Sequence, residues 1–442
     1  MAPKKQLHFN FFEMACTGAH MAIGQWKTPG DLQEKKDTLE YYLWLAKLAE
    51  KGKISCIFFA DVYGAEDLYE GSAKACYETA SGVGWMDPLA LVSGMAAVTK
   101  NPFIMARTAA TLDHVTQGRF AWNVVTSYSG TAARAMGKSE ATEHDTRYDA
   151  AHEYMELVYS MWEGSHEDGA KVFNRETGQA YDWDKVHKVT FKGKHHNSEA
   201  WGPSHASPQR TPVIFQAGSS KAGAEFAGKH GEAIFMGGNK PATAAPTVQR
   251  IRDIAKAHGR DPNHVKFFPQ ITPFIGRTLE EAQEKYRKAL ANADYRGGLA
   301  KLSNYLGIDL SQFPLDEPFK MDDTKINGIQ TMINIFKRDP TKVWTPRLMG
   351  QQMAFMGFAQ MPVGTPDMIA DVIEEWAEEG SIDGFNVACM MLRIPSPPPF
   401  LQFHANSPNS RRQQPNQLRR YFSQFLDPKH GLTYLPQISS NS

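Results

Sequence analysis

Polar side chains follow three apolar, strand-like segments of the sequence at the point where each segment ends. Asp61 closes CIFFAD, Asn123 and Ser127 lie at the end of RFAWNVVTS, and Ser219 and Ser220 come directly after IFQAG. In a parallel α/β barrel the carboxyl ends of the strands converge on one face, and ligands bind there. We therefore predict that these five residues line one pocket.

The segment IFQAGSSKAGAEFAG reads as a strand, a glycine turn, two serines and a helix. Free N–H groups at the helix start, its positive dipole end and the hydroxyls of Ser219 and Ser220 would suit a phosphate. An ordinary serine N-cap gives the same pattern, so both interpretations stay open. The overlapping GAEFAGKH resembles a P-loop but has His230 where Ser or Thr must bind magnesium, which argues against a nucleoside triphosphatase.

His144 and Tyr148 begin a helix in HDTRYDAAHEY and lie four residues apart, on one face of its first turn. A lone histidine there would more often be structural, but the paired tyrosine at a barrel mouth favours a binding role. Metal-site spacings such as HExxH, paired cysteines or an acidic calcium loop do not occur in the sequence, which predicts no metal. The four cysteines are widely spaced, as expected of a reduced interior.

The sequence segments that must position these residues alternate between strand-like and helix-like patterns of apolar residues. Apolar runs with strand character alternate with helical periodicity, which predicts a parallel sheet covered by helices. Seven strands without an opening GxGxxG turn fit a (β/α)8 TIM barrel better than an open sheet. The strands are expected at residues 6–12, 56–61, 119–127, 211–218, 232–238, 264–276 and 383–391, and the helices at residues 37–52, 87–99, 148–162, 220–231, 247–259, 278–291 and 366–380. The expected apolar face of the first helix consists of Leu39, Tyr42, Leu43, Ala46 and Ala49.

One barrel strand is missing from this series. The helix at 87–99 is followed by KNP and then by a second helix-like stretch, with no evident strand between them, although a βαβ crossover needs one. We expect either a gap beside CIFFAD and RFAWNVV or a makeshift strand at residues 101–106. Either outcome would leave the pocket short of a polar contact and the activity weak or absent.

Length and composition limit the remaining possibilities. The 442 residues fit one enlarged barrel, with 48 basic and 48 acidic side chains, so no overall charge favours nucleic acid or a membrane. No apolar stretch approaches a membrane span, and we expect a cytoplasmic protein. We predict a barrel domain over residues 1–390 and a disordered tail rich in Pro, Asn, Gln and Arg over residues 391–442. Insertions at about 165–210 and 295–345 are expected to be lids or dimer contacts.

Several of these segments resemble one family. GRFAWNVVTSYSGTAARAMG, ATLDHVTQGR, EHDTRYDAAHEYMELVYSMWEGS and SPQRTPVIFQAGSS are similar to the bacterial-luciferase-like flavin monooxygenases, in the branch that oxidises long-chain alkanes, nitrilotriacetate and dibenzothiophene sulfone. The resemblance covers about residues 6–388. It implies a TIM barrel that binds reduced FMN from a separate NAD(P)H-dependent flavin reductase and uses dioxygen to insert one oxygen atom into a small organic substrate. A homodimer or homotetramer is expected.

The resemblance also implies roles for particular residues. Asp61, His144, Tyr148 and Ser219 or Ser220 match flavin-contacting positions, and Asn123 and Ser127 match the strand end beneath the flavin ring. Cys16 and His20 are similar to a pair near the substrate, with one extra residue between them, and His144 or His20 could supply a proton. Two alternatives remain: a catalytically impaired flavin-binding paralogue, and a barrel that uses the deazaflavin F420.

Overall fold

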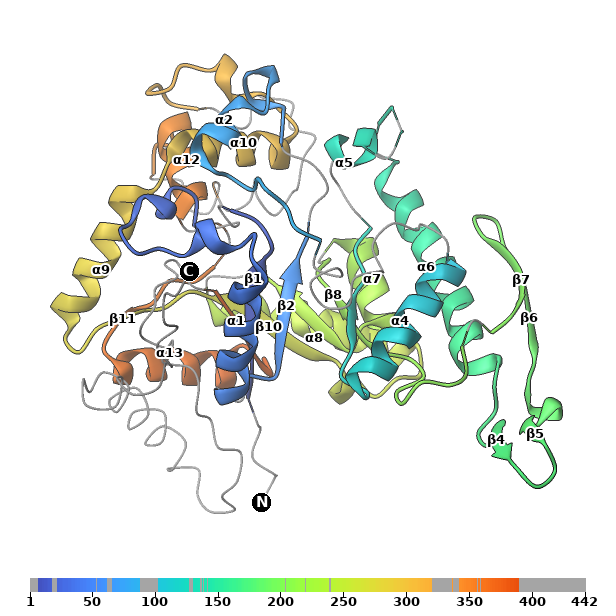
Figure 1. Cartoon of the computed structure of the whole chain (residues 1–442). Helices are drawn as coiled ribbons and strands as arrows, with labels where there is room; N and C mark the ends of the chain where they lie inside the picture. Colours follow the sequence, from blue (N-terminus) through green and yellow to red (C-terminus); the bar gives the residue numbers. More distant parts are fainter. Residues whose placement is uncertain are drawn as a thin grey trace, which may run out of the picture. The chain divides into compact units, whose positions relative to one another are not determined.

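The computed structural model divides the chain into two compact units, which are drawn in Figure 1. Unit 1 comprises Met1–Trp85, Gly237–Ala244 and Pro269–Ser442, and unit 2 comprises Met86–Met236 and Ala245–Phe268. The structure describes residues 7–17, 22–52, 54–61, 66–87, 102–126, 130–135, 137, 139–140, 142–202, 204–218, 220–237, 240–319, 336, 342–355, 357 and 359–388. The predicted tail at 391–442 and the predicted helix at 88–99 lie outside these residues.

Unit 1 contains parallel strands in the order β2-β1-β13-β10. These strands are β1 (His8–Met14), β2 (Cys56–Ala60), β13 (Gly384–Val387) and the second half of β10 (Lys266–Ile271). Phe9 of β1 lies opposite Phe385 of β13, and the two rings stack at a centroid distance of 6.1 Å. Runs of buried residues on neighbouring strands are typical of a parallel sheet that is covered on both faces.

Unit 1 contains the three helices predicted at 37–52, 278–291 and 366–380, and three helices that were not predicted. They are α1 (Leu39–Lys51), α2 (Lys74–Thr79), α9 (Leu279–Asn292), α10 (Tyr295–Leu306), α12 (Pro346–Phe355) and α13 (Pro366–Glu379). The expected apolar face of α1 was partly wrong, because Leu43 is 52% exposed, and Ala46 is exposed too. Tyr41, Leu45 and Leu48 are buried instead. Figure 1 shows α2, α10 and α12 gathered at the end of the unit toward which β2 points.

Unit 2 continues the same architecture with parallel strands in the order β10-β9-β8-β3. They are the first half of β10, then β9 (Ala233–Met236), β8 (Val213–Gln216) and β3 (Ala121–Asn123). The accompanying helices are α4 (Pro102–Thr116), α5 (Gly130–Ala135), α6 (His144–Gly164), α7 (Lys221–His230) and most of α8 (Pro241–Ala257). All seven predicted strands and six of the predicted helices are therefore present, with shifted ends.

Residues 102–116 form helix α4, so the expectation of a makeshift strand at 101–106 is wrong. Its small residues Ala106, Ala109 and Ala110 pack against α6, and the Trp162 indole N–H donates to the Ala106 carbonyl at 3.0 Å. Among the described residues, the parallel strands number seven, with β2 and β3 at the two ends of the order. The alternative expectation, a gap in the barrel, stays a prediction because residues 88–101 are not described.

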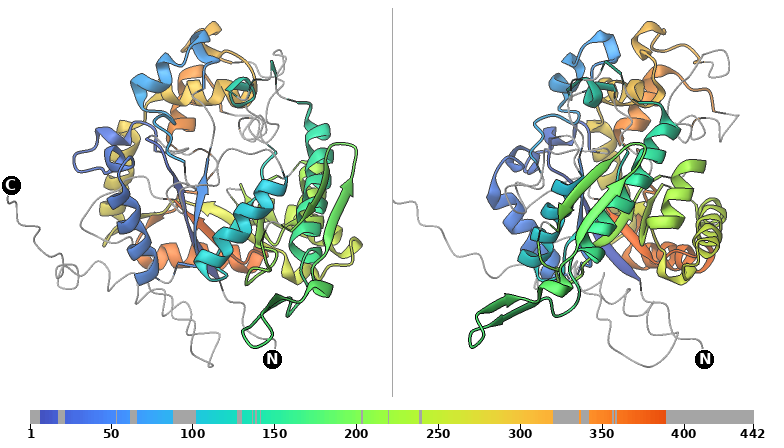
Figure 2. Two further views of the ribbon diagram at one scale, coloured as in Figure 1. Left: turned by 45° about the vertical axis from the view of Figure 1, so that its right-hand side comes forward. Right: turned by 90° about the vertical axis from the view of Figure 1, so that its right-hand side faces the viewer.

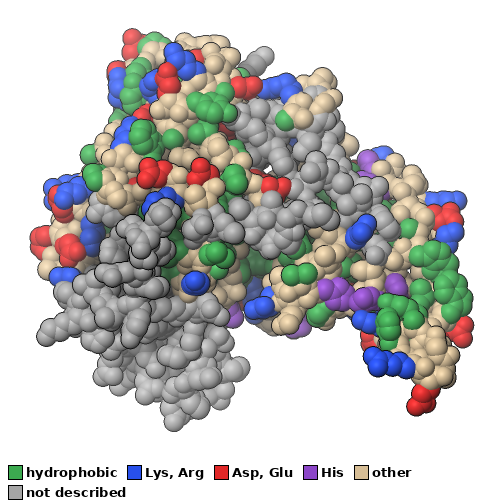
Figure 3. Space-filling model, in the orientation of Figure 1, with side chains coloured by type: hydrophobic (Ala, Val, Ile, Leu, Met, Phe, Trp, Pro, Cys, Tyr) green, Lys and Arg blue, Asp and Glu red, His purple; other side chains and the backbone are tan. Residues whose placement is uncertain are grey.

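The insertion after α6 forms two hairpins, β4 (Lys171–Asn174) with β5 (Gln179–Tyr181) and β6 (Lys188–Lys192) with β7 (Asn197–Trp201). Figure 2 shows β6 and β7 beside α6, with β4 and β5 extending away from that helix. Hydrophobic side chains are exposed on the insertion (Figure 3), and Phe173, Trp183 and Trp201 are 60%, 64% and 45% exposed.

Short elements complete the described chain: a two-stranded sheet of β11 (Phe274–Ile275) and β12 (Val363–Gly364), and the 3-10 turns Gln25–Lys27, Gln33–Lys35, Tyr69–Gly71, Trp183–Lys185, Pro262–His264 and Leu310–Gln312. None of the helices among the described residues is long and apolar enough to cross a membrane.

Candidate active site

The turn between β8 and α7 forms the centre of the candidate site in unit 2. Ser220 is the N-cap of α7, and its hydroxyl oxygen accepts a hydrogen bond from the Gly223 N–H at 3.0 Å. Because that oxygen is an acceptor in the cap, the hydroxyl proton is available to a second partner. Ser219 lies outside the described residues. Ser220 is thus the serine N-cap that the sequence allowed. This role is compatible with phosphate binding, which stays a prediction.

Helix α6 brings His144 and Tyr148 to this turn. Its N-cap Glu143 accepts from the Asp145 and Thr146 amides at 2.9 and 2.7 Å, and these hydrogen bonds lower the pKa of Glu143 to about 2. His144 Nε2 lies 3.4 Å from Ser220 Oγ, and its ring lies 5.1 Å from the Tyr148 ring. The other imidazole nitrogen lies 2.7 Å from an Asp145 oxygen, which favours the tautomer with a proton on Nδ1. His144, Tyr148 and Ser220 therefore lie close together in unit 2, and their flavin-binding role stays a prediction.

Two glycines allow the Tyr148 hydroxyl to approach the backbone of the turn. A Cβ atom at Gly218 would lie 2.4 Å from this hydroxyl, and one at Gly223 would lie 2.9 Å from it. Both distances are too short for any residue with a side chain. Tyr148 is only 8% exposed, so its hydroxyl is held within a narrow space beside the start of α7.

Buried amide oxygens mark the carboxyl ends of two neighbouring strands in unit 2. Asn123 ends β3, Gln216 ends β8, and Asn123 pairs with Phe215 in the register of the two strands. The side-chain oxygens Oδ1 of Asn123 and Oε1 of Gln216 are buried and accept no hydrogen bond from any part of the chain that is described. Buried acceptors of this kind are usually satisfied, so their position favours a ligand with donor groups.

These features fit FMN, the cofactor implied by the sequence resemblance. A phosphate can accept from the N-terminal amides of α7, from Ser220 and from the Tyr148 hydroxyl. The hydroxyls of the ribityl chain and the N–H of the flavin ring are donors of the kind that the orphaned oxygens of Asn123 and Gln216 lack.

A partly buried hydrogen-bonded chain, centred on the buried His230, holds α6 against α7. His152 Nδ1 lies 2.9 Å from His230 Nε2, and the Tyr159 hydroxyl lies 3.2 Å from His230 Nδ1. Phe226 packs against both imidazole rings. Burial, aided by the nearby charges of His152 and Lys229, lowers the pKa of His230 to about 3, so this ring is neutral at physiological pH. The chain fixes the helix pair that carries His144, Tyr148 and Ser220.

Unit 1 contributes two of the predicted site residues. Asp61 follows β2 directly and is exposed, and Cys16 follows β1 and is fully buried. Burial raises the pKa of Cys16 to about 12, against smaller lowering effects of Lys36 and Lys301. The sulfur is therefore a thiol at neutral pH, which can donate a weak hydrogen bond but cannot act as a thiolate nucleophile. The predicted site residues His20 and Ser127 lie outside the described residues.

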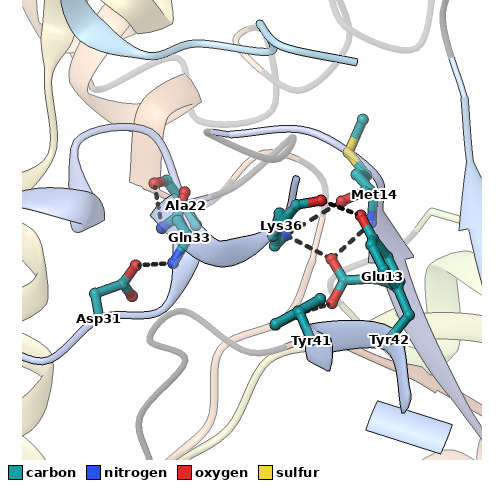
Figure 4. Close-up of polar contacts among 8 residues, drawn as sticks. All are labelled: Glu13, Met14, Ala22, Asp31, Gln33, Lys36, Tyr41 and Tyr42. Atoms are coloured by element: carbon teal, nitrogen blue, oxygen red, sulfur yellow. Dashed lines mark hydrogen bonds and ion pairs between the residues drawn. The ribbon is translucent and has the colours of Figure 1, made fainter. Parts of the chain in front are cut away.

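A buried ion pair fixes the chain at the end of β1 (Figure 4). One carboxylate oxygen of Glu13 accepts from the Lys36 ammonium at 2.5 Å and from the Met14 amide at 2.8 Å, and the other accepts from the Tyr41 hydroxyl at 2.5 Å. Lys36 also donates to the Met14 carbonyl, and Tyr42 donates to the Lys36 carbonyl. This Glu13 network ties α1 and the preceding loop to the strand that leads to Cys16.

Sequence reasoning missed three polar residues with the signature of a binding site. Gln216 ends a strand as Asn123 does, so the same rule could have found it. Lys301 interrupts the apolar run GGLAKLSNYL and is 2% exposed, and its partner Glu66 is 8% exposed. A charge inside an apolar helical run was a usable signal, whereas the identity of its distant partner was not.

Comparisons with known proteins agree with the resemblance. The family described as luciferase-like monooxygenase matches residues 21–383. The chain is 37% identical to a dimethyl-sulfide monooxygenase of Hyphomicrobium sulfonivorans, over 87% of this chain and 82% of that protein. It is 38% identical to a long-chain alkane monooxygenase of Geobacillus thermodenitrificans, over 90% of this chain and 88% of that protein. The crystal structure of a riboflavin lyase with modified FMN and riboflavin superposes with a TM-score of 0.78 at 33% identity and covers 88% of each chain.

Proposed function

Because this chain belongs to the luciferase-like monooxygenase family, it is a flavin-dependent monooxygenase, and we propose that the β8–α7 turn of unit 2 binds the phosphate of reduced FMN. The observation that carries this proposal is the convergence of Ser220, His144 and Tyr148 on a turn whose two glycines leave room for the Tyr148 hydroxyl. The alternatives of an impaired paralogue and an F420-dependent barrel are not favoured, since the relatives are monooxygenases.

Each residue of the turn has a task in this proposal. The α7 amides and the Ser220 hydroxyl donate to the phosphate, and the Tyr148 hydroxyl donates from the opposite side of the turn. The His144 ring lies beside Ser220, so it is proposed to form one side of the phosphate site. Asn123 and Gln216 accept from donors further along the cofactor, which relieves the cost of two buried, unpaired oxygens.

Reduced FMN supplies the two electrons with which dioxygen is activated, so one oxygen atom enters the substrate and the other leaves as water. The chain's own contribution is to bind, orient and exclude water. Asp61 is proposed to contact the flavin, with Ser127 and Ser219 completing the cofactor contacts. His20 and the thiol of Cys16 are proposed to lie on the substrate side. Of the two expected proton donors, His144 lies at the proposed phosphate turn, so His20 is the proposed donor to the reacting oxygen.

The substrate is proposed to be a small organic molecule that is oxygenated at sulfur or carbon. Relatives named for dimethyl sulfide and for long-chain alkanes support this range. A separate NAD(P)H-dependent flavin reductase would supply the reduced FMN, and residues 1–390 would act as one catalytic domain in the cytoplasm. A gap in the barrel beside the CIFFAD and RFAWNVV strands is retained as a proposal, and it predicts weak or absent activity, with turnover below about 1 per second.

A homodimer or homotetramer is also proposed. The exposed aromatic side chains Phe173, Trp183 and Trp201 of the insertion support it, because large apolar groups at a surface often mark interfaces. Sedimentation should give at least twice the 49.4 kDa chain mass. A monomer at micromolar concentration would contradict this.

Replacing Ser219 and Ser220 by Ala tests the phosphate site. We expect reduced FMN to bind more weakly by about 1 to 3 kcal/mol, because hydrogen bonds to a charged group are lost. The control is Thr278→Ala, which removes a similar N-cap from α9, where Thr278 accepts from the Glu281 amide. Both changes should lower the unfolding free energy by about 1 kcal/mol, and only the serine change should weaken FMN binding. Equal FMN affinity in all three proteins would remove the serines from the site.

A further inference from the structure

Unit 1 contains a second buried ion pair that no step above uses. Lys301 of α10 places its ammonium 3.0 Å from Glu66 Oε1, and the two side chains are 3% and 10% exposed. The Lys301 ammonium also lies over the Tyr305 ring, 5.5 Å from its centroid, and Tyr305 belongs to a buried apolar cluster. A charged pair in such surroundings costs desolvation free energy, which only good geometry and further hydrogen bonds can offset.

The Glu66 carboxylate is only half satisfied. Its Oε1 meets Lys301, whereas Oε2 is buried and accepts no hydrogen bond from the described part of the chain. A buried carboxylate oxygen without a donor loses its hydrogen bonds to water and gains none in exchange. Burial correspondingly raises the pKa of Glu66, partly opposed by Lys301. Because the Lys301 ammonium, 3.0 Å from Oε1, opposes this effect and favours the ionised carboxylate, Oε2 offers an acceptor site for one hydrogen-bond donor.

The pair lies beside the segment that contains Cys16. A Cβ atom on Gly82 would lie 3.8 Å from the Lys301 ammonium, and the Gly82 amide donates to the Thr17 carbonyl at 3.1 Å. The positive charge of Lys301 acts on the Cys16 thiol, whose pKa it lowers against the larger effect of burial. The Cys76 thiol donates to the Glu66 carbonyl at 3.3 Å and fixes the backbone on the other side.

We propose that Glu66, held by Lys301, is a specificity site that binds a hydroxyl or N–H donor on an uncharged organic substrate. This inference rests on the proposed function for the substrate side of Cys16. The pair has no net charge, so a neutral donor satisfies Oε2 without adding an unbalanced buried charge. An ammonium group would add one, and a pure hydrocarbon would leave Oε2 unpaired, so both are disfavoured.

Three sulfides of equal size test the preference. They are ethyl propyl sulfide, hydroxyethyl ethyl sulfide and aminoethyl ethyl sulfide, which end in a methyl, a hydroxyl and an ammonium group at the same position. Their binding is measured by calorimetry on the FMN-loaded protein, and their oxygenation is measured with a flavin reductase. We expect the hydroxyl compound to bind at least about tenfold more tightly than either of the other two compounds.

The double variant Glu66→Leu/Lys301→Met removes the pair without leaving a lone charge. It should lose this preference and favour ethyl propyl sulfide, while Glu284→Leu/Lys288→Met, which removes an exposed pair of the same kind in α9, should keep the wild-type preference. If the double variant does not fold, Glu66→Gln cannot replace it, because that change leaves a group which can still hydrogen-bond a hydroxyl. The decisive second variant is Glu66→Met/Lys301→Leu, which also removes both polar ends and should lose the preference for the hydroxyl compound in the same way.

Outcomes for the pair and for the proposed function are separable. Equal binding of all three sulfides by the wild type, or an unchanged preference in the double variant, would overturn the inference and leave a buried water at Oε2. A binding preference that follows Glu66, without oxygenation of any sulfide, would support the specificity site and count against the proposed function.

Discussion

Two buried lysine–glutamate pairs in unit 1 have similar burial and different hydrogen bonding. In the Glu13 network both carboxylate oxygens accept hydrogen bonds, from Lys36, Met14 and Tyr41. In the Glu66–Lys301 pair one oxygen has an ammonium partner and the other has none among the described residues. Both oxygens of Glu13 therefore have hydrogen-bond partners within the protein, and the pair fixes local structure. The second oxygen of Glu66 needs a donor from elsewhere, so that pair is the incomplete one. Satisfaction of every polar atom, more than burial, separates a structural ion pair from a candidate binding site.

Replacing the complete pair should have the largest effect. Glu13→Leu/Lys36→Met removes both charges but takes the carboxylate acceptor away from the Tyr41 hydroxyl and the Met14 amide. At about 1 to 3 kcal/mol for each lost acceptor, we expect the unfolding free energy to fall by about 2 to 6 kcal/mol in urea titrations. A loss below about 1 kcal/mol would mean that the Glu13 network is not the structural partner in this comparison.

The neutral, buried His230 should make the unfolding free energy depend on pH. His230 has a folded-state pKa of about 3, whereas an unfolded histidine titrates near about 6.5. The unfolded chain therefore binds the proton more readily, so stability is full above the higher value and falls as pH decreases toward the lower one, by up to about 1.4 kcal/mol per pH unit.

His230→Gln should flatten this acid-induced loss, because glutamine keeps a donor and an acceptor but does not titrate. The matched control is His264→Gln, at a histidine side chain that is 78% exposed. Unfolding free energies are measured between pH 4 and pH 7.5. The slope of free energy against pH gives the number of protons taken up on unfolding, and we expect this number to differ between the two variants by up to about 1. Equal slopes in both variants would show that His230 is not a source of the acid sensitivity.

Replacing the incomplete pair should cost little. Glu66→Leu/Lys301→Met removes a buried ion pair whose carboxylate is already short of a donor, so we expect the unfolding free energy to stay within about 1 kcal/mol of wild type. Calorimetric melting would measure it beside Lys301→Met alone, which leaves Glu66 without its ammonium and should be the less stable protein. A double variant as unstable as the Glu13 double variant would erase the difference between the pairs.

Removing an exposed pair should have the smallest effect. Lys288 and Glu284 lie 3.3 Å apart on α9, with side chains 72% and 42% exposed. Solvent screening leaves such pairs worth at most about 0.5 kcal/mol, so Glu284→Gln/Lys288→Gln should be near neutral in the same urea titration. A loss above about 1 kcal/mol would mean that burial is a poor guide to the value of ion pairs in this protein.

Sequence patterns predicted the strand ends well, because a short apolar run followed by polar residues is typical of a buried strand that ends at a binding face. Asn123 and Ser220 were found in this way, together with the helix turn of His144 and Tyr148. The buried face of α1 was partly missed, since a helix with apolar residues on several sides offers more than one periodic face, and its neighbours select among them. The Glu66–Lys301 pair was not predictable, because tertiary contact alone brings such distant residues together.

The described cysteines have a consequence for an enzyme that handles reduced flavin in air. Burial raises the pKa of Cys16, Cys56 and Cys76 to about 12 each. Whenever oxygen is reduced without reaching a substrate, hydrogen peroxide is released, and peroxide oxidises the thiolate form of cysteine. Because neutral pH lies about five units below these pKa values, roughly one in 10⁵ of these thiols is in the thiolate form. These three thiols are therefore poor targets for the peroxide that is released when reduced flavin reacts with oxygen and no substrate is oxygenated.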